Sequence, residues 1–569
     1  MNSPSIPTVA ERIALALKRH GVDVIFAQSL PSAVILAAEA IGIRQIAYRQ
    51  ENMGGAMADG YARRKGRVAV VAAQNGPAAT LLVPPLAEAL KASVPIIALV
   101  QDVERNQADR NAFQELDHLD LFRVCAKWVR RVISADRIDD YVDMAFTAAA
   151  SGRPGPAVLL LPADLLREPA PPARFARNSS LGSIPLDLTR PNDNLIQDAA
   201  ERIASARAPI AIVGGGIHNG QAVTALAELQ ELANLPVFTT NMGKGAVDEY
   251  HPLSAGVITL TGPRSLGRHC RDLIDDADLV LLVGTRTNQN GTDSWRLIPQ
   301  TASVIHVDVD PQEIGRTYEA IRLVGDAGET LSALCAFLER QDLHRRRANR
   351  KHVEALIAAA WASFEDDRRL LVDANKSLLR PELVMVELQS HLTPNTTVVA
   401  DASYSSMWIV GQLRSLKSGM RFISPRGLAG LGWGLPLAIG AKAAVPQHPV
   451  VIVVGDGGFA HSWAELETLV RCNLPVIVIL LNNGILGFQK HAETVKFGRF
   501  TSACHLNPVD HAKIAEACGC AAMRVHERSD LSAALDRAFN GDGPLLIEVM
   551  TSPDAFPPLS LFAQLEDVA

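Results

Sequence analysis

The sequence predicts an α/β protein whose three domains each contain a parallel β-sheet. Short, unbroken apolar runs such as Val450–Val454 and Leu279–Val283 are typical of parallel strands that are buried on both faces. Several of these runs lead into a glycine-containing loop and then into a segment with the apolar spacing of a helix. A chain of 569 residues is also too long for one ordinary domain.

The composition narrows the expected partners and compartment. With 48% hydrophobic and 20% charged residues the chain is globular, and its net charge of −6 favours neither nucleic acid nor an anionic membrane as a partner. The seven cysteines lack zinc-type spacing, so we expect reduced thiols in a cytoplasmic protein. We expect neither a signal peptide nor a membrane span, because residues 1–21 have the pattern of an amphipathic helix and no apolar run is of membrane length.

Residues 1–167 are expected to form the first domain. A helix around Ile13, Ala16 and Leu17 comes first. The expected strands are Asp23–Phe26, Gln45–Tyr48, Arg67–Ala73 and Pro95–Val100. The last two strands flank a loop and a helix, so they form one βαβ unit.

A linker and a middle domain follow. Residues 168–192 are rich in proline and serine, which is typical of an interdomain linker. Residues 193–340 form the middle domain, with strands expected at Ala211–Val213, Pro236–Thr240, Leu279–Val283 and Val304–Asp308. Residues 341–380 are expected to form a linker helix whose charge run is solvated rather than a binding patch.

The third domain covers residues 381–553 and contains a second βαβ unit, from Val450 to Asn483. Its plan parallels that of the first domain: Pro95 follows Gly76 by 19 residues, and Pro475 follows Gly457 by 18. This spacing favours two domains of one topology, although any two βαβ units look alike to this degree. Residues 554–569 are a tail, whose apolar part, DAFPPLSLF, is expected to close over a site.

Polar groups gather where two strands of the third domain end. The loop Gly455–Gly458 follows the strand Val450–Val454, and Asn482 and Asn483 end the strand that follows. Both therefore lie at the carboxyl edge of the sheet, where open α/β sheets bind ligands. Asp456 and Asn483 offer hard oxygens that suit Mg²⁺, and glycine N–H groups approach a diphosphate closely. The alternative is a pair of ordinary turns.

This GDG–spacer–NN pattern resembles the cofactor signature of thiamine-diphosphate (ThDP) enzymes. The resemblance implies that Mg²⁺ is held by Asp456, Asn483 and the carbonyl of Ile485, and that Gly457 and Gly458 lie against the diphosphate. Two such motifs on a single βαβ unit are much less expected by chance than either motif alone.

A second segment, RQENMGGAMADGYAR, resembles the part of these enzymes that carries the cofactor-activating glutamate. By that resemblance Glu51 hydrogen-bonds the pyrimidine ring and favours the tautomer that takes the C2 proton. The alternative is a solvated glutamate that stabilises a helix N-terminus. Asn75, in the loop Gln74–Pro77, is assigned to the same cofactor site.

Two segments of the third domain complete the expected cofactor site. RGLAGLGWGLPLAIGAK resembles the acetolactate synthase segment that bends the cofactor, which places Leu431 under the cofactor and Gly430 beside it. A glycine-rich helix entry packed in the core is the alternative. In DASYSSMW, Ser405 and Ser406 are candidate donors to the diphosphate, although serines in such loops commonly cap helices.

The expected substrate pocket combines Gln28, Ser29, Phe113, Gln114 and Phe488. NAFQELDHLDLF resembles the region in which a glutamine faces the reacting carbon, so Gln114 is assigned a catalytic role and Phe113 the pocket wall. FAQSLPSA lacks the glycines usual in acetolactate synthases. After the asparagine pair, Ala492 takes the place of a tryptophan found in biosynthetic members, which leaves the substrate open.

The resemblance extends over nearly the whole chain, as three Rossmann-like domains: pyrimidine-binding, middle and diphosphate-binding. The chain is similar to the acetolactate synthase-like superfamily, whose relatives include benzaldehyde lyase and 2-hydroxyacyl-CoA lyase. The resemblance implies a ThDP- and Mg²⁺-dependent carbon–carbon lyase or ligase that acts on a 2-oxo acid. Its alternatives are cleavage of a 2-hydroxyacyl-CoA or acyloin without decarboxylation, and a flavin oxidase of the pyruvate-oxidase kind.

The resemblance also bears on assembly and on the middle domain. It implies a homodimer or homotetramer whose active sites form between subunits, with a small-molecule 2-oxo acid or acyl-CoA as substrate. VGGGIHNG, residues 213–220, leaves FAD, ADP or no nucleotide open for the middle domain. A non-catalytic paralogue is disfavoured, because Glu51, Asp456 and Asn483 are all present.

Overall fold

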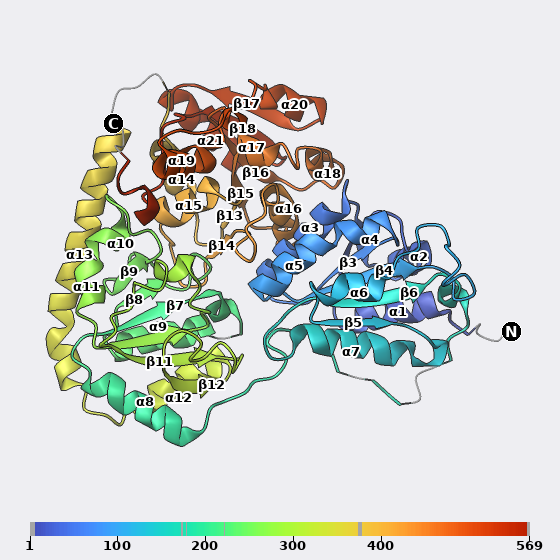
Figure 1. Cartoon of the computed structure of the whole chain (residues 1–569), viewed down its shortest axis with the longest axis horizontal. Coiled ribbons are helices and arrows are strands. Elements are labelled where there is room, and N and C mark those ends of the chain that lie inside the picture. The colour runs from blue at the N-terminus through green and yellow to red at the C-terminus, as the bar shows by residue number, and fades with distance from the viewer. Residues whose placement is uncertain (1–5, 172–174, 178, 221, 374–377, 566–569) are drawn as a thin grey trace.

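The computed structural model describes residues 6–565, apart from residues 172–174, 178, 221 and 374–377. Three 6-stranded sheets follow one another along the chain, one in each predicted domain (Figure 1). All three are parallel. The α/β class and the three parallel sheets are therefore confirmed.

The sheet of the first domain has the order β2-β1-β3-β4-β6-β5. Helices cover both faces, so its central strands are buried almost throughout, which explains their unbroken apolar runs. The strands are β1 (Val24–Ala27), β2 (Arg44–Ile46), β3 (Ala69–Ala73), β4 (Ile96–Asp102), β5 (Trp128–Arg131) and β6 (Ala157–Pro162). The helices are α1 (Val9–Arg19), α2 (Ser32–Ala40), α3 (Glu51–Lys65), α4 (Pro77–Leu81), α5 (Val83–Ala92), α6 (His118–Arg123) and α7 (Ile138–Ala150).

The second predicted strand is shorter than the sequence suggested. It ends at Ile46 rather than Tyr48. Tyr48 instead enters the core, where its hydroxyl donates to the carbonyl of Ala72, 2.7 Å away. Tyr48 is therefore held by a side-chain hydrogen bond and not by strand pairing.

The sheet of the third domain repeats this plan. Its order, β14-β13-β15-β16-β18-β17, is that of the first sheet when the strands of each are counted from its own first strand. The strands are β13 (Thr397–Ala400), β14 (Arg421–Ile423), β15 (Val450–Gly455), β16 (Val476–Asn482), β17 (Ala521–Val525) and β18 (Leu545–Met550). The helices are α14 (Pro381–His391), α15 (Tyr404–Gln412), α16 (Gly434–Ala444), α17 (Asp456–Phe459), α18 (Glu465–Arg471), α19 (Gly487–Phe497), α20 (His511–Ala517) and α21 (Arg528–Asn540). The shared order confirms the prediction of two domains with one topology.

The middle domain differs from the other two. Its order β12-β11-β10-β7-β8-β9 is the arrangement of a dinucleotide-binding Rossmann sheet. The strands are β7 (Pro209–Val213), β8 (Val237–Thr239), β9 (Ser254–Val257), β10 (Leu279–Val283), β11 (Ser303–Asp308) and β12 (Ile321–Val324). The helices are α8 (Asp193–Ser205), α9 (Ala222–Leu232), α10 (Leu266–His269), α11 (Arg271–Asp275) and α12 (Ala327–Leu338).

The charged segment after the middle domain forms the long helix α13 (His344–Val372), which runs along the edge of the molecule in Figure 1. The sequence predicts that the charge run of this helix is solvated, and the structure shows that this is wrong for Arg346. Arg346 is 1% exposed and donates to the carbonyls of Ala233 and Asn234, just past the end of α9. A guanidinium satisfies the open carbonyls of a helix end, which accounts for its burial.

Two further expectations concern cysteines and membranes. All seven cysteines are free thiols. Among the described residues, no helix is both long and apolar enough to cross a membrane.

The first and third domains are joined through α3 and α16, which lie side by side (Figure 1). One apolar core runs through both domains and includes Met53 and Leu435. Glycines set the spacing: a Cβ at Gly60 would lie 2.1 Å from the carbonyl oxygen of Leu437, and one at Gly440 only 1.8 Å from that of Met57. The two helices therefore touch backbone to backbone.

We expect Gly440→Ala to destabilise the protein. Overpacking a close backbone contact costs about 1–3 kcal/mol, which outweighs the gain of about 1 kcal/mol in helix propensity. Thermal unfolding measures the difference. Gly543→Ala is the control, because an added Cβ there would meet no atom within 4 Å. Equal melting temperatures for the two variants would contradict the tight contact.

Candidate active site

The predicted metal residues lie next to each other at the carboxyl edge of the third sheet. β15 and β16 pair in parallel with Gly455 opposite Leu481, so Asp456 and Asn483 leave neighbouring strands at the same level. Asp456 Oδ2 accepts from the N–H of Gly484 at 2.8 Å. The predicted tight turn at Gly455–Gly458 is in fact the start of the short helix α17, which begins at Asp456.

Burial raises the pKa of Asp456, although the N–H groups of Gly484 and Gly457 partly offset that shift. A buried carboxylate without a neighbouring cation is unfavourable, and a bound divalent ion would relieve that cost. The side-chain oxygens of Asp456 and Asn483 with the carbonyl of Ile485 form a hard-oxygen donor set that fits Mg²⁺.

A cavity of about 890 Å³ opens at this edge, and we call it the third-domain cavity. Its volume lies in the range of pockets that hold a cofactor-sized ligand. Of the residues predicted for the site, those lining it are Ser405, Leu431, Asp456, Gly457, Gly458, Asn483, Ile485 and Phe488. The cavity thus brings together most of the predicted third-domain residues.

Two predicted residues of the third domain lie outside the lining. Gly430 is flanked by Ala429 and Leu431, which do line the cavity. The hydroxyl of Ser406 donates to the carbonyl of Ser403 and accepts from Arg426, so its single proton is already used. Ser405 is therefore better placed than Ser406 to donate to a diphosphate.

The segment that precedes Leu431 is held by a carboxylate from the first domain. Glu88, on α5, is 2% exposed and accepts from the backbone N–H groups of Gly427, Leu428 and Ala429. Arg63 lies 3.8 Å from the same carboxylate and donates to the carbonyl of Ser424. One buried charge therefore fixes the path of this loop.

The segment that follows Leu431 is held in the same way. Asp401, just after β13, is 1% exposed and accepts from the N–H groups of Gly432, Trp433 and Gly434. Leu431 lies between the two anchored stretches and keeps 43% of its surface exposed. An exposed leucine on a rigid loop at a cavity wall suits an apolar support for a bound ring.

Glu51 is the first residue of α3 and is half-buried. Beside it, burial and the charge of Glu51 together raise the pKa of Tyr48. Gln28 donates to the carbonyls of Tyr48 and Arg49, at 3.4 and 3.2 Å, and so supports the chain that leads into Glu51. Both Gln28 and Ser29 are exposed at the end of β1.

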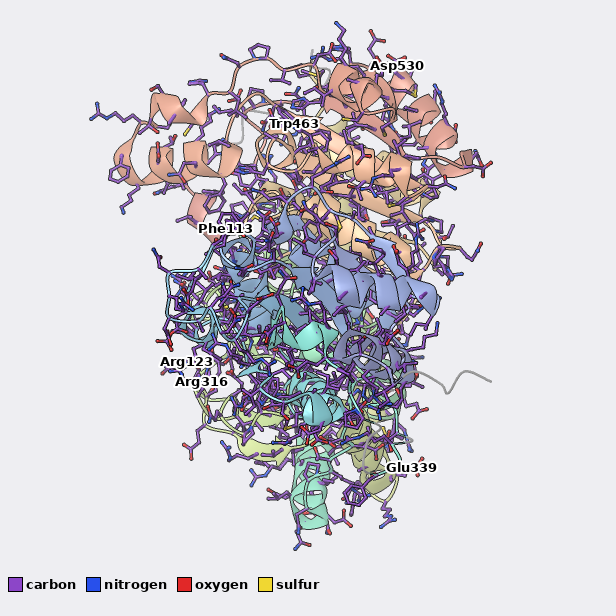
Figure 2. All side chains as sticks on the ribbon, turned by 90° about the vertical axis from the view of Figure 1, so that its right-hand side faces the viewer. Phe113, Arg123, Arg316, Glu339, Trp463 and Asp530 are labelled. Carbon is purple, nitrogen blue, oxygen red and sulfur yellow. The ribbon has the colours of Figure 1, made fainter. Side chains whose placement is uncertain are left out.

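The predicted Gln114 lies on a loop that Asn75 anchors. The Asn75 amide donates to the carbonyl of Gln114 at 3.1 Å and to that of Phe113 at 3.3 Å. Gln114 adopts a left-handed φ of +59°, and within the described residues its buried side-chain oxygen has no hydrogen-bond partner. Phe113 is 82% exposed. Its side chain is labelled in Figure 2. Asn75 therefore positions the loop rather than lining the cavity.

A buried histidine supports the same loop. His118 accepts from the N–H of Gly76 at 3.0 Å and lies 3.2 Å from Asp102, to which Arg131 donates. Since Nε2 accepts, Nδ1 carries the proton and donates to Asp102. The sequence did not predict that His118 is buried and supports this loop, because its neighbours in the sequence include several acidic residues, which are typical of an exposed segment.

The C-terminal tail reaches the third-domain cavity, as its sequence suggested. Ala555, Leu559, Ser560 and Leu561 line the cavity. Ser560 donates to Asp293 of the middle domain at 2.8 Å. Residues 566–569 lie outside the described part of the chain.

Among the described residues, the lining of the third-domain cavity includes none from the first domain. Glu51, Gln28, Asn75, Phe113 and Gln114 all lie at the carboxyl edge of the first sheet instead. The single chain therefore does not bring its two sets of predicted residues into one cavity.

A second cavity, of about 200 Å³, lies at the carboxyl ends of β7, β10 and β11, and we call it the middle-domain cavity. A Cβ at Gly214 would lie 2.4 Å from the carbonyl oxygen of Gly284, so this glycine serves the packing of two loops. Pockets for drug-sized ligands measure about 300–1,000 Å³. A flavin dinucleotide thus does not fit unless the lining side chains move.

Comparison with known proteins matches the chain in three parts. Thiamine pyrophosphate (TPP) is another name for ThDP. The family model for the N-terminal TPP binding domain of thiamine pyrophosphate enzymes matches residues 7–121, that for their central domain matches 196–334, and that for their C-terminal TPP binding domain matches 401–549. Each match lies within one domain. The central match contains its whole sheet, the N-terminal match ends before β5 and β6, and the C-terminal match begins just after β13.

Similar proteins extend over nearly the whole chain. An acetolactate synthase of Mycobacterium bovis is 32% identical over 567 residues, which cover 96% of this chain and 88% of that protein. A probable acetolactate synthase large subunit of Methanococcus aeolicus is 30% identical and covers 96% and 92%. The acetolactate synthase isozyme 2 large subunit of Escherichia coli is 29% identical and covers 95% of each.

We expect Glu88→Gln to lower the free energy of unfolding by about 1–3 kcal/mol, because the new amide NH₂ would face a backbone N–H that needs an acceptor. Thermal unfolding with and without ThDP measures the effect, and the displaced loop should also weaken ThDP binding. Glu104→Gln is the control, since it removes an exposed pair with Arg167 worth less than about 1 kcal/mol. A melting temperature equal to that of the control would contradict the anchor.

Proposed function

This chain belongs to the thiamine-diphosphate-dependent enzymes, in their acetolactate synthase-like group, and on that premise we propose that it catalyses the carboligation of 2-oxo acids. The observation that carries the proposal is the third-domain cavity, which Asp456, Asn483 and Leu431 all line. The full-length similarity to acetolactate synthases supports it. We take residues 1–167, 193–340 and 381–553 as the pyrimidine-binding, middle and diphosphate-binding domains.

In this proposal Asp456, Asn483 and the carbonyl of Ile485 hold Mg²⁺ against the diphosphate, with Ser405, Gly457 and Gly458 beside it. When bound, ThDP would supply a nucleophilic C2 carbon and a cationic thiazolium ring that can take up the electron pair left by loss of CO₂. Leu431 supports the cofactor from below and excludes water from that face.

The first domain supplies the groups that handle protons. Glu51 hydrogen-bonds the pyrimidine ring and directs the proton away from C2. We assign to Gln114 the orientation of a substrate oxygen, because its unsatisfied side-chain oxygen is free to accept a hydrogen bond from a hydroxyl group or a water. Gln28, Ser29, Phe113 and Phe488 shape the pocket around the substrate.

Two alternatives have less support. Cleavage of a 2-hydroxyacyl-CoA or acyloin uses the same cofactor, but the relatives described above are named acetolactate synthases. A flavin oxidase needs FAD in the middle-domain cavity, where the room is about 200 Å³. Purified protein with a flavin spectrum that bleaches on adding substrate would establish the oxidase. The seven free cysteines suit the cytoplasmic location that we expect.

We infer that the complete site forms between two chains. Glu51 and Asp456 lie on different domains, and the third-domain cavity has no first-domain residue among those described. Phe113 and Leu431 are both exposed in the single chain, which suits residues that a second copy covers. The active unit is then a homodimer, on its own or within a homotetramer.

A substrate screen tests the reaction directly. ThDP-loaded protein is incubated with pyruvate and other 2-oxo acids, with acyloins and with 2-hydroxyacyl-CoA esters, and the products are identified by mass spectrometry. We expect carboligation products and CO₂ from the 2-oxo acids. Turnover confined to the CoA esters would replace this proposal with its lyase alternative.

We expect Glu51→Gln to keep ThDP bound but to lower kcat by about 10²–10⁴-fold, because proton transfer to and from C2 is lost. Calorimetric titration with ThDP measures the binding, and CO₂ release measures turnover. Undiminished turnover would remove the proton role from Glu51.

The assembly is tested by mixing two inactive variants. Asp456→Ala should lose Mg²⁺ and ThDP together, and coexpression with Glu51→Gln should restore roughly a quarter of wild-type activity, since half the dimers then hold one intact site. If each chain contained a complete site of its own, coexpression would restore nothing.

A further inference from the structure

Arg426 lies where the third-domain and middle-domain cavities meet. It lines both cavities, as do Asn241, Thr259 and Asn290 of the middle domain. Arg426 follows β14 and immediately precedes the loop that Glu88 anchors. Its backbone therefore directly precedes an anchored loop of the third-domain cavity.

The charge of Arg426 is not neutralised. Its Nη2 donates to the hydroxyl of Ser406, which is its one hydrogen-bond partner within the described residues, and its buried Nε has no partner there. No ion pair joins it to a described carboxylate. Burial lowers its pKa to about 10, while Glu88 opposes that shift, so the group stays charged at neutral pH.

The carboxylates near Arg426 already accept hydrogen bonds from other groups. Glu88 accepts three backbone N–H groups, and Asp401 accepts three others. Asp293 accepts from Ser560 and pairs with Arg296, and Asp456 accepts from Gly484. Since Nε is buried and one N–H of Nη2 is used by Ser406, Nη1 and the second N–H of Nη2 are the donors left for an anionic group from outside the protein.

We propose that Arg426 binds the carboxylate of the acceptor 2-oxo acid and so selects oxo acids over aldehydes as the second substrate. This inference rests on the proposed carboligation. A planar guanidinium matches a carboxylate with two parallel N–H donors, and such charge-assisted hydrogen bonds are short and strong. The side-chain amides of Asn241 and Asn290, which line the same two cavities, supply further donors.

The chemistry favours the acceptor over the donor. The donor 2-oxo acid loses its carboxylate as CO₂, so a guanidinium bound to that carboxylate would stabilise the ground state and oppose the reaction. The acceptor keeps its carboxylate from binding to product release. A fixed cation therefore stabilises the bound acceptor at every stage, whereas it would oppose the decarboxylation of the donor.

The test compares two acceptors that differ by one carboxylate. Isotopically labelled pyruvate is the donor, and 2-oxobutyrate and propanal compete as acceptors. In Arg426→Gln we expect the ratio of oxo-acid product to aldehyde product to fall at least about tenfold, with partial recovery in Arg426→Lys. The ratio is independent of the overall rate, so a general loss of activity does not imitate the effect.

Arg296→Gln is the matched control. Arg296 also lines the third-domain cavity, but its side chain is 69% exposed and is paired with Asp293 at 3.2 Å. This variant removes the same charge from the same cavity, and we expect its product ratio to equal that of the wild type. An equal change of the product ratio in both variants would mean that any positive charge in the cavity has this effect, and it would overturn the inference.

A binding measurement separates this inference from the proposed reaction. Oxamate, a carboxylate shaped like pyruvate but unreactive, is titrated calorimetrically into ThDP-loaded protein. We expect binding at least about tenfold weaker in Arg426→Gln and unchanged ThDP affinity. If the wild type fails to carboligate yet binds oxamate through Arg426, the proposed function falls and the carboxylate site stands. An unchanged product ratio in an active Arg426→Gln variant, or ThDP binding that weakens as much as oxamate binding, would overturn the site.

Discussion

Two buried carboxylates hold the loop on which the proposed site is built. The side chains of Glu88 and Asp401, rather than backbone carbonyls, accept the backbone N–H groups on either side of Leu431. Unmade hydrogen bonds of buried N–H groups would cost several kcal/mol in total, at about 1–3 kcal/mol each. The glycines follow from this constraint: a Cβ at Gly458 would lie 2.1 Å from Asp401. The loop is thus held closely enough to keep an apolar side chain exposed.

The same constraint joins two domains into one body. Glu88 belongs to the first domain and its loop to the third, while α3 and α16 touch through glycine a short distance away. A motion of one domain against the other would break the α3–α16 contact and the loop anchor together. The residues proposed to hold the cofactor and those proposed to handle protons therefore stand on one frame, although among the described residues only the first set lines the third-domain cavity.

The third-domain cavity has opposite chemistry at two of its walls. Asp456, Asn483 and Ile485 offer oxygens for a cation, and Arg426 offers N–H groups for an anion. Under the proposed function, such separation would direct a metal-bound diphosphate to one group of residues and a carboxylate to the other. The hydroxyl of Ser406 accepts a hydrogen bond from Arg426.

The sequence by itself determined the three parallel sheets and the meeting of Asp456 with Asn483, because buried strands are apolar throughout and parallel strands end at one edge. It also placed Glu51 at the start of α3. Only the tertiary structure decided the roles of Glu88, His118, Asp401 and Arg426. Their burial depends on backbone groups and cavities formed by distant segments, Glu88 on a loop 339 residues away, and a lone charged residue in a sequence carries no mark of such a partner.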